Sequence, residues 1–170
     1  MIREFLTFRI EGALLGVDIN CVEEVLSEVI LTPVPLSETS VAGLVNLRGR
    51  VMVGLDLRAR LGHPPWRSEV SQASVVLRTT TAQACLVVDR IGDVLRAEDS
   101  QFEPAPHTLD LRVRQLVCGA YALDRELLLA VDVHALLDPA ASGPAASGLA
   151  ASGLATSDTG VRATARPARA

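Results

Sequence analysis

GLVNLRGRVMVGLDLRARLG, residues 43–62, carries the clearest structural signal in the chain. Two apolar runs flank the segment NLRG, which is the pattern of two strands joined by a tight turn. DLRARLG then predicts a short helix, which Gly62 can end in a left-handed conformation. Arg48 lies in the turn, where it could be a solvated turn residue, a catalytic cation or part of a surface that grips another protein.

The same plan recurs later in the chain, in GAYALDRELLLAVDVHALLD, residues 119–138. Glycine, leucine and aspartate recur at matching places, and the apolar positions of the strands coincide. Strand, turn, strand and helix therefore occur twice. This repeat predicts two related β modules over residues 1–62 and 73–138, with HPPWRSEVSQ, residues 63–72, as the linker.

The remainder of the segment that ends at Asp138 also reads as short strands. Residues 6–10 alternate between apolar and polar side chains, and Glu11-Gly12 offers a turn before the strand ALLGVD. Asn20 precedes Glu23 by three positions, a capping-box spacing that predicts a short helix with Val22, Val25 and Leu26 on one face. Further strand-like runs follow at VILTPV, SVVLRT, CLVVD, DVLRA and LVCGAYAL. Many short strands separated by turns indicate an all-β barrel or sandwich with a few short helices.

Residues 139–170 differ sharply from this region. They hold three copies of Ala-Ala-Ser-Gly, no aromatic residue and no sustained apolar period. Such a segment cannot bury enough surface to offset the entropy of ordering it. We expect a disordered, low-complexity C-terminal tail, or alternatively a tether that ends in Arg162, Arg166 and Arg169.

Composition excludes several classes of function. Three of the arginines but only one acidic residue lie beyond Asp138, so the body before it is clearly acidic, which argues against a nucleic-acid partner. The three cysteines are widely spaced and predict neither a disulfide framework nor a zinc site. The start MIREFLTFRI is too polar for a signal peptide, and no run is long and apolar enough for membrane insertion. We expect a cytoplasmic protein.

The residues offer little for catalysis. The histidines His63, His107 and His134 have no partners at metal-ligand spacing, and no nucleophile or phosphate-binding motif is present. The sequence therefore predicts no enzyme activity, no metal and no cofactor. Glu24 projects near the edge of the predicted helix, where it could meet Arg48 and hold the turn and the helix in one arrangement.

Four segments together resemble the CheW-like coupling proteins of bacterial chemotaxis. They are FLTFRIEGALLGVDINCVEEVL, VAGLVNLRGRVMVGLDLRARLG, CLVVDRIGDVL and ELLLAVDVHALL, so the resemblance covers residues 3–138. It implies a domain of two five-stranded, SH3-like β barrels packed together. It also implies a scaffold that joins methyl-accepting chemoreceptor tips to a CheA-type histidine kinase beneath membrane arrays, with other CheW-like proteins as further partners.

The resemblance assigns candidate sites residue by residue. Receptor binding falls to Glu24, Arg48, Ile91 and Val94, and the last two would line a groove between the barrels that takes a receptor helix. Kinase binding falls to Val22 and Gly43, although a helix-core role for Val22 and a turn role for Gly43 explain these residues at least as well.

Two positions depart from the family pattern: Gly54 replaces a usual proline, and Cys85 stands where glycine is common. Cys85 could crowd the floor of the groove or fill it. These departures leave open an adaptor for a motility or surface-sensing array other than flagellar chemotaxis. A small β-barrel module that binds nucleic acid or a small ligand, and an enzyme of an unrecognised kind, are the remaining alternatives.

Overall fold

The computed structural model describes residues 1–71 and 73–138. Its strands are β1 (Ile2–Ile10), β2 (Ala13–Asp18), β3 (Val22–Leu26), β4 (Val29–Ile30), β5 (Val41–Leu47), β6 (Arg50–Asp56), β7 (Val70–Ser71), β8 (Ser74–Arg78), β9 (Gln83–Val87), β10 (Arg90–Glu98), β11 (Phe102–Glu103), β12 (Val117–Ala122) and β13 (Leu127–Val131). The helices are α1 (Leu57–Arg60), α2 (Leu111–Leu116) and α3 (Val133–Leu137). The expected all-β class is confirmed, and the expected tail lies outside the described residues.

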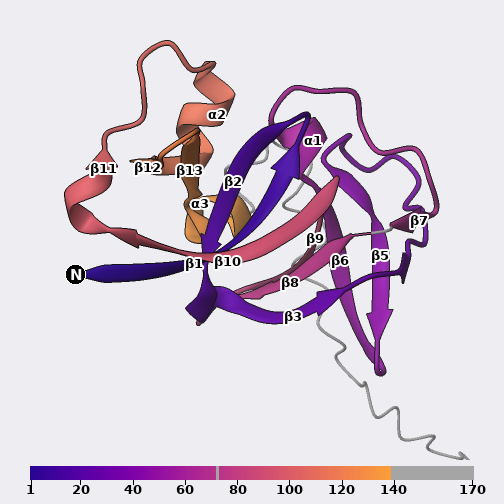
Figure 1. Ribbon diagram of the computed structural model, residues 1–170. Helices are drawn as coiled ribbons and strands as arrows, with labels where there is room; N and C mark the ends of the chain where they lie inside the picture. The colour runs from indigo at the N-terminus through magenta and orange to yellow at the C-terminus, as the bar shows by residue number, and fades with distance from the viewer. Residues whose placement is uncertain (72, 139–170) are drawn as a thin grey trace, which may run out of the picture.

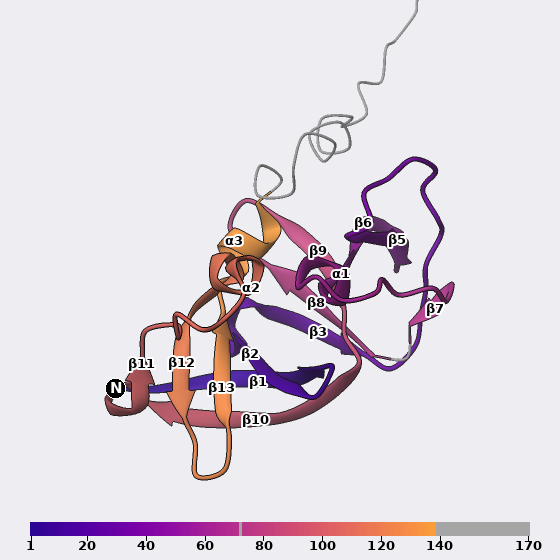
Figure 2. The same cartoon turned by 90° about the horizontal axis from the view of Figure 1, so that it is seen from above.

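Two main sheets contain most of these strands. Sheet A has the order β10-β1-β2-β13-β12-β11 and sheet B the order β3-β8-β9-β6-β5, while β4 and β7 form a small third sheet. In Figure 1 the strands β11 and β12 lie on one side of the molecule and β5, β6 and β7 on the other. The view from above in Figure 2 shows the same separation.

Short connections link the outer strands of each main sheet. In sheet A the outer strands β10 and β11 are consecutive and joined only by the 3-10 turn Asp99–Gln101. In sheet B the chain runs from the outer strand β3 to Thr32, which forms a β-bridge with Leu44 of the other outer strand, β5. The outer strands of each sheet are thus brought together, as the predicted pair of barrels requires.

The strand order corrects the expected division of the chain into 1–62 and 73–138. Strands β1 and β2 pair into sheet A beside β13, and β8 and β9 pair into sheet B beside β6. Residues 1–62 therefore contribute the hairpin β1–β2 to sheet A and the strands β3, β5 and β6 to sheet B. Residues 73–138 contribute the hairpin β8–β9 to sheet B and the strands β10, β12 and β13 to sheet A. The repeat is real in element order, but hydrophobic alternation does not specify which strand is the partner, so the modules are not contiguous.

Apolar side chains form three clusters that follow this architecture. One lies in sheet A and includes Phe5, Tyr121 and Leu128. A second lies in sheet B and includes Val45 and Cys85. The largest, which we call the shared core, draws residues from β1, β2, β8, β9, β12 and β13 and from all three helices. Because the shared core belongs to both sheets, it fixes one barrel against the other.

The repeated hairpins end in equivalent helix caps. The Asp56 carboxylate accepts a hydrogen bond from the Ala59 N–H at the start of α1, and Asp132 accepts one from Ala135 at the start of α3. Gly62 has a φ of 87°, so the predicted left-handed end of the first helix is confirmed. The helix α2 was not predicted.

The prediction of a short helix after Asn20 is wrong. A 3-10 turn spans Ile19–Cys21, and the following residues form strand β3. Asp18 is the capping residue, because its carboxylate accepts from the Asn20 N–H at 2.9 Å. The segment VEEVL pairs with β8 across sheet B, and this tertiary pairing overrides the local capping signal.

Candidate functional site

The turn that contains Arg48 is strained. Arg48 has a φ of 52° and Gly49 a φ of 83°, and the flanking residues Leu47 and Arg50 pair directly. Two central residues with positive φ suit the right-handed twist of a hairpin, but they favour Asn and Gly. The Asn46 side chain stabilises the turn by accepting from the Gly49 N–H at 3.0 Å. Arginine is costly here, so turn formation alone does not explain it.

Arg48 reaches across to β3. Its Nη2 donates to Glu24 Oε1 at 2.7 Å, so the structure brings the two predicted residues together. Of the two side chains, that of Arg48 is 73% exposed and that of Glu24 25% exposed. An ion pair this exposed contributes little stability, and its guanidinium keeps donors available to a partner.

A second cluster of charges lies beside this pair. Arg50 Nη2 donates to Glu23 Oε1 at 2.7 Å, and Gln83 Nε2 donates to Glu23 Oε2 at 2.5 Å. Arg78 Nε lies 3.7 Å from the same carboxylate. The hydrogen bond from Arg50 is the main reason that the pKa of Glu23 is lowered. Arg50 thus joins β3 to the β5–β6 hairpin at the other edge of sheet B, whereas Arg78 lies on β8 and Gln83 on β9.

A β-bulge lets the neighbours Glu23 and Glu24 both face this hairpin. Val22 pairs with Leu77 and Glu24 with Val76, so Glu23 is an extra residue in β3. The bulge also puts Val22 and Val25 on one face, because their partners Leu77 and Val75 both belong to the shared core. In an unbroken strand, residues three apart would point to opposite faces.

The strand β10 has the same irregularity. Ile91 pairs with Phe8 and Val94 with Leu6, so three steps along β10 match two along β1. Phe8 and Leu6 both belong to the shared core, which places Ile91 and Val94 on its side. The offset from Val22 to Ile91 equals the offset from Val25 to Val94, so the two pairs are equivalent in the repeat.

The bulge in β10 is shaped by Thr7 and Gly92. The buried Thr7 hydroxyl donates to the Asp93 carbonyl at 2.6 Å. A Cβ on Gly92 would lie 2.5 Å from Thr7 Oγ1, so no larger residue fits without displacing that hydroxyl. Glycine at position 92 is therefore a requirement of close packing.

Val22, Val25, Ile91 and Val94 form what we call the aliphatic quartet. Val25 is 45% exposed and Val94 48% exposed, whereas Val22 and Ile91 pack against the shared core. The quartet lies on β3 and β10, which are outer strands of the two sheets. Each pair thus extends the apolar side of the shared core toward the exposed end of its strand. Sequence reasoning missed Val25, and the common offset between the two pairs is the signal that could have identified it.

Gly43 has a structural explanation. Its φ is 149°, and a Cβ at this position would lie 2.7 Å from the Thr32 carbonyl oxygen. The bulge between Val41 and Gly43 and the bridge from Thr32 to Leu44 require the same close approach. The structure favours the turn-and-packing role for Gly43 over direct contact with a partner.

The two departures from the family pattern lie inside sheet B. Gly54 pairs with Gly43, and Leu31 packs over it so closely that a Cβ would lie 2.9 Å from Leu31 Cδ2. Cys85 is fully buried in the second cluster, and burial raises the pKa of its thiol to about 11. Cys85 therefore fills the interior of a barrel and does not line the quartet.

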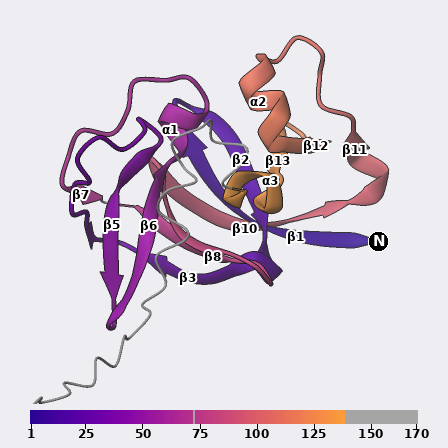
Figure 3. The same cartoon turned by 180° about the vertical axis from the view of Figure 1, so that it is seen from behind.

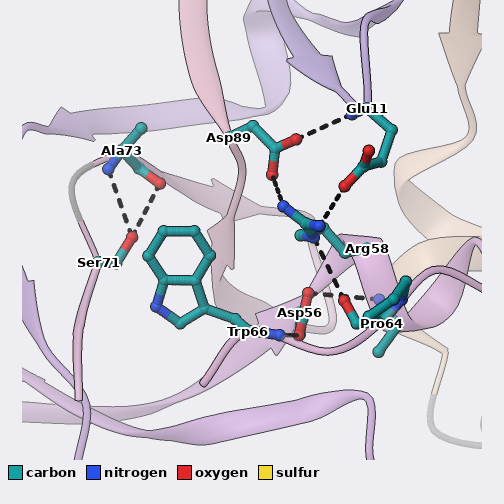
Figure 4. A network of polar contacts seen from close by, with 9 residues as sticks. Glu11, Asp56, Arg58, Pro64, Trp66, Ser71, Ala73 and Asp89 are labelled. Carbon is teal, nitrogen blue, oxygen red and sulfur yellow. Dashed lines mark hydrogen bonds and ion pairs between the residues drawn. The ribbon is translucent and has the colours of Figure 1, made fainter. Parts of the chain in front are cut away.

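Arg58 joins segments of both barrels (Figure 4). Its guanidinium lies between Asp89, at 3.1 Å, and Glu11 of the β1–β2 turn, and it also donates to the Pro64 carbonyl. Asp89 accepts a further hydrogen bond from the Glu11 N–H at 2.8 Å. Since Asp89 directly precedes β10, this network fixes where that strand begins.

Within residues 1–71 and 73–138, no cluster of three or more His, Cys, Asp or Glu side chains could hold a metal ion. In the same part of the chain, no helix is long and apolar enough to span a membrane. The polar contacts described above are ion pairs and hydrogen bonds that hold neighbouring strands and turns together.

Comparison with known proteins gives consistent matches. A family model described as a CheW-like domain matches residues 4–141. A probable chemotaxis protein CheW of Rhizobium etli is 30% identical over 140 residues, which is 82% of this chain and 90% of the relative. The chemotaxis protein CheW of Thermotoga maritima is 33% identical and covers 79% of this chain and 87% of its own. The crystal structure of the scaffolding protein TtCheW from Thermoanaerobacter tengcongensis superposes with a TM-score of 0.68 at 26% identity, over 78% of this chain and 90% of that one.

Proposed function

This chain belongs to the CheW-like family and has a scaffold role in chemotaxis; from that premise we propose that it couples chemoreceptor tips to a CheA-type histidine kinase. Neither partner is part of the structure, so the proposal rests on the surface of the chain. The proposed function also implies a location beneath membrane receptor arrays. It requires no chemical step in this chain.

The observation that carries the receptor half of the proposal is the arrangement of β3 and β10. Their two bulges each align two aliphatic residues on the shared-core side of an outer strand, and Glu24, which pairs with Arg48, directly precedes Val25. An amphipathic helix docks by placing an apolar stripe against such a surface. In this proposal Val25, Ile91 and Val94 supply affinity for the receptor helix. The Glu24–Arg48 pair sets the register of that helix.

The kinase half concerns Val22 and Gly43. Val22 packs against the shared core, and Gly43 allows segment 31–32 to cross β5 closely. We propose that both act on the kinase surface indirectly, because they set the shapes of the outer strands β3 and β5. Other CheW-like proteins would meet equivalent outer surfaces in an array.

Titration calorimetry with a receptor-tip fragment tests this function. Arg48→Glu places a carboxylate opposite Glu24 and should weaken binding while circular dichroism stays unchanged. Glu69→Arg, on an exposed loop before β7, is a control that also reverses one charge. Equal binding by wild type and Arg48→Glu would remove Arg48 from the interface, and absence of binding by well-folded wild type would refute the receptor role.

A further inference from the structure

The start of strand β10 lies where the chain passes from one main sheet to the other. Val88 and Asp89 alone separate β9, in sheet B, from β10, in sheet A. Val88 is buried in the shared core, and Ile91, which the proposed function places at the receptor surface, follows two residues after Asp89. The position of Asp89 therefore bears directly on where Ile91 and Val94 lie.

Three contacts from distant parts of the sequence hold Asp89. Its N–H donates to the Arg9 carbonyl at 3.2 Å, and its carboxylate accepts from the Glu11 N–H at 2.8 Å and from Arg58 Nη1 at 3.1 Å. Arg9 and Glu11 belong to β1 of sheet A and the turn that follows it, whereas Arg58 lies on α1, directly after β6 of sheet B. Arg58 thus ties the start of β10 to a segment that comes from the other sheet.

The guanidinium of Arg58 uses all three of its nitrogens in this network, as Figure 4 shows. Besides Asp89, it meets the Glu11 carboxylate through Nη2 and the Pro64 carbonyl through Nε at 3.3 Å. The side chain is only 23% exposed, so these contacts are better shielded from solvent than an ordinary surface pair. A planar guanidinium fixes the directions of its acceptors, whereas apolar contact is non-directional.

The network borders the apolar contact between the two sheets. Figure 1 and the view from behind in Figure 3 both show α1 beside the β1–β2 hairpin. Leu57, next to Arg58, and Val88, next to Asp89, both belong to the shared core. The shared core holds the sheets together, and the polar network beside it adds a defined direction at the point where β10 begins.

The same network holds the β1–β2 turn in a strained conformation. Glu11 has a φ of 48°, in the left-handed region that few residues other than glycine adopt. Both its N–H and its carboxylate bind into the network, to Asp89 and Arg58 respectively. Strain of this kind persists where the surrounding contacts impose it, and it is typical of positions that serve a function.

The repeated unit shows that a helix of this plan does not require the arginine. At the position equivalent to Arg58, α3 has His134, and α3 begins with the same kind of aspartate cap as α1. The strand equivalent to β9 is β2, which ends at Asp18, and Asp18 accepts two hydrogen bonds from Asn20, at 2.9 and 2.8 Å. The aspartate of that unit thus caps its own turn. The arginine network is a feature of the unit that precedes β10.

We propose that Arg58 is a positioning residue for receptor binding, because through Asp89 it holds the start of β10, and with it Ile91 and Val94, where a receptor helix meets them. This role rests on the proposed receptor binding and adds a residue that acts without contact with the receptor. Neither Arg58 nor Asp89 belongs to the shared core, so the chain should still fold without the network. Residues that act indirectly in this way change an affinity by roughly two- to thirtyfold.

Arg58→His tests the proposal, because histidine occupies the equivalent place in α3. Titration calorimetry with the receptor-tip fragment should show binding weakened by roughly two- to thirtyfold. Affinity for a CheA regulatory domain should stay at the wild-type value. Arg58→Lys keeps the charge but offers one nitrogen in place of three, so it should restore part of the lost receptor affinity.

Arg3→His is the matched control. Arg3 Nε donates to Asp99 at 3.2 Å, and Asp99 directly follows β10 just as Asp89 directly precedes it. The control therefore removes an arginine–aspartate contact at the other end of the same strand, with the same change of side chain. It should bind the receptor-tip fragment as wild type does.

Amide spectra of the isotope-labelled full chain test the positioning in the absence of a partner. In Arg58→His the signals of residues 89–94 should move, while those of β8 and of residues 95–98 stay in place. Asp89→Asn removes the charge that Arg58 and the Glu11 N–H meet, so it should move the same signals and also weaken receptor binding. In the double variant the two losses of affinity should not add, because both variants break one contact.

The outcomes separate this role from the proposed function. Unchanged receptor affinity in Arg58→His, an equal loss in Arg3→His, or unmoved signals at residues 89–94 would overturn the role of Arg58 and leave the proposed function standing. An equal loss of affinity for the CheA regulatory domain, or failure of both Arg58→His and Arg58→Lys to fold, would show a general structural role and overturn it too. If the wild type does not bind the receptor-tip fragment, the proposed function itself fails, and the role of Arg58 fails with it.

Discussion

Replacing Arg48 with asparagine separates a structural role for this residue from a binding role. A non-glycine residue in the left-handed region costs about 1–2 kcal/mol, and asparagine tolerates this region far better than arginine. The substitution also removes the pair with Glu24, which contributes at most about 1 kcal/mol at this exposure. The two effects oppose each other, so the free energy of unfolding should stay level or rise by up to about 1 kcal/mol.

Arg50→Asn is the matched control. Arg50 forms an ion pair of the same 2.7 Å length, but it lies in the extended strand β6 and not at a positive φ. Its loss brings no relief of strain, and asparagine is a poor strand residue, so this variant should be less stable than wild type.

Urea unfolding followed by the fluorescence of Trp66, the single tryptophan, measures both variants. The same preparations are titrated with the receptor-tip fragment, for which Arg48→Asn should lose affinity while keeping or gaining stability. A loss of more than about 1 kcal/mol in Arg48→Asn would show that the pair holds the barrel closed and would refute the binding role.

Packing and charge lead to three further predictions. Gly92→Ala should destabilise the protein by about 1–3 kcal/mol through overpacking against Thr7, and adding Thr7→Ala should recover part of that loss in a double-mutant cycle; additive losses would contradict the contact. The pKa of Glu23 is lower in the folded state, so its stabilisation is present above the unfolded pKa of about 4.3 and is lost as the pH falls through the folded value; Glu23→Gln should flatten acid unfolding curves, and unchanged curves would exclude this contribution. The Cys85 thiol, with a pKa of about 11, should resist iodoacetamide at about pH 8 until the protein unfolds, as mass spectrometry of labelled peptides would show, whereas rapid native labelling would contradict its burial.

Local patterns predicted the hairpins well. The segment around Arg48 forms the expected strand, turn, strand and helix, and its repeat does so again at residues 119–138. Such units are specified by turn residues, alternation and caps that lie close together in the sequence. The meeting of Glu24 with Arg48 was also anticipated, although from a helix that does not exist.

Partner strands could not be predicted in the same way. Alternation shows which face of a strand is apolar, but β2 and β13 or β6 and β9 pair in parallel across long stretches of chain. The exchange of hairpins between the two halves follows from these pairings and leaves no local trace. A bulge is equally hidden, because one extra residue is defined only against the opposing strand.

The candidate site depends on those hidden features. Val22 and Val25 share one face of β3, and Ile91 and Val94 share one face of β10, only because each strand contains a bulge. Gly92 looks like an ordinary turn residue until the buried Thr7 hydroxyl is placed against it. The resemblance to a family supplied Ile91 and Val94, whereas the structure supplies the reason why they lie together.

The most direct test of the account is whether the two partners bind at the same time. Sedimentation velocity of the full chain with a receptor-tip fragment and a CheA regulatory domain distinguishes the possibilities. The account predicts a ternary complex that contains all three components, and loss of only the receptor fragment in Arg48→Glu. Displacement of one partner by the other would contradict the claim that this chain couples them through separate surfaces.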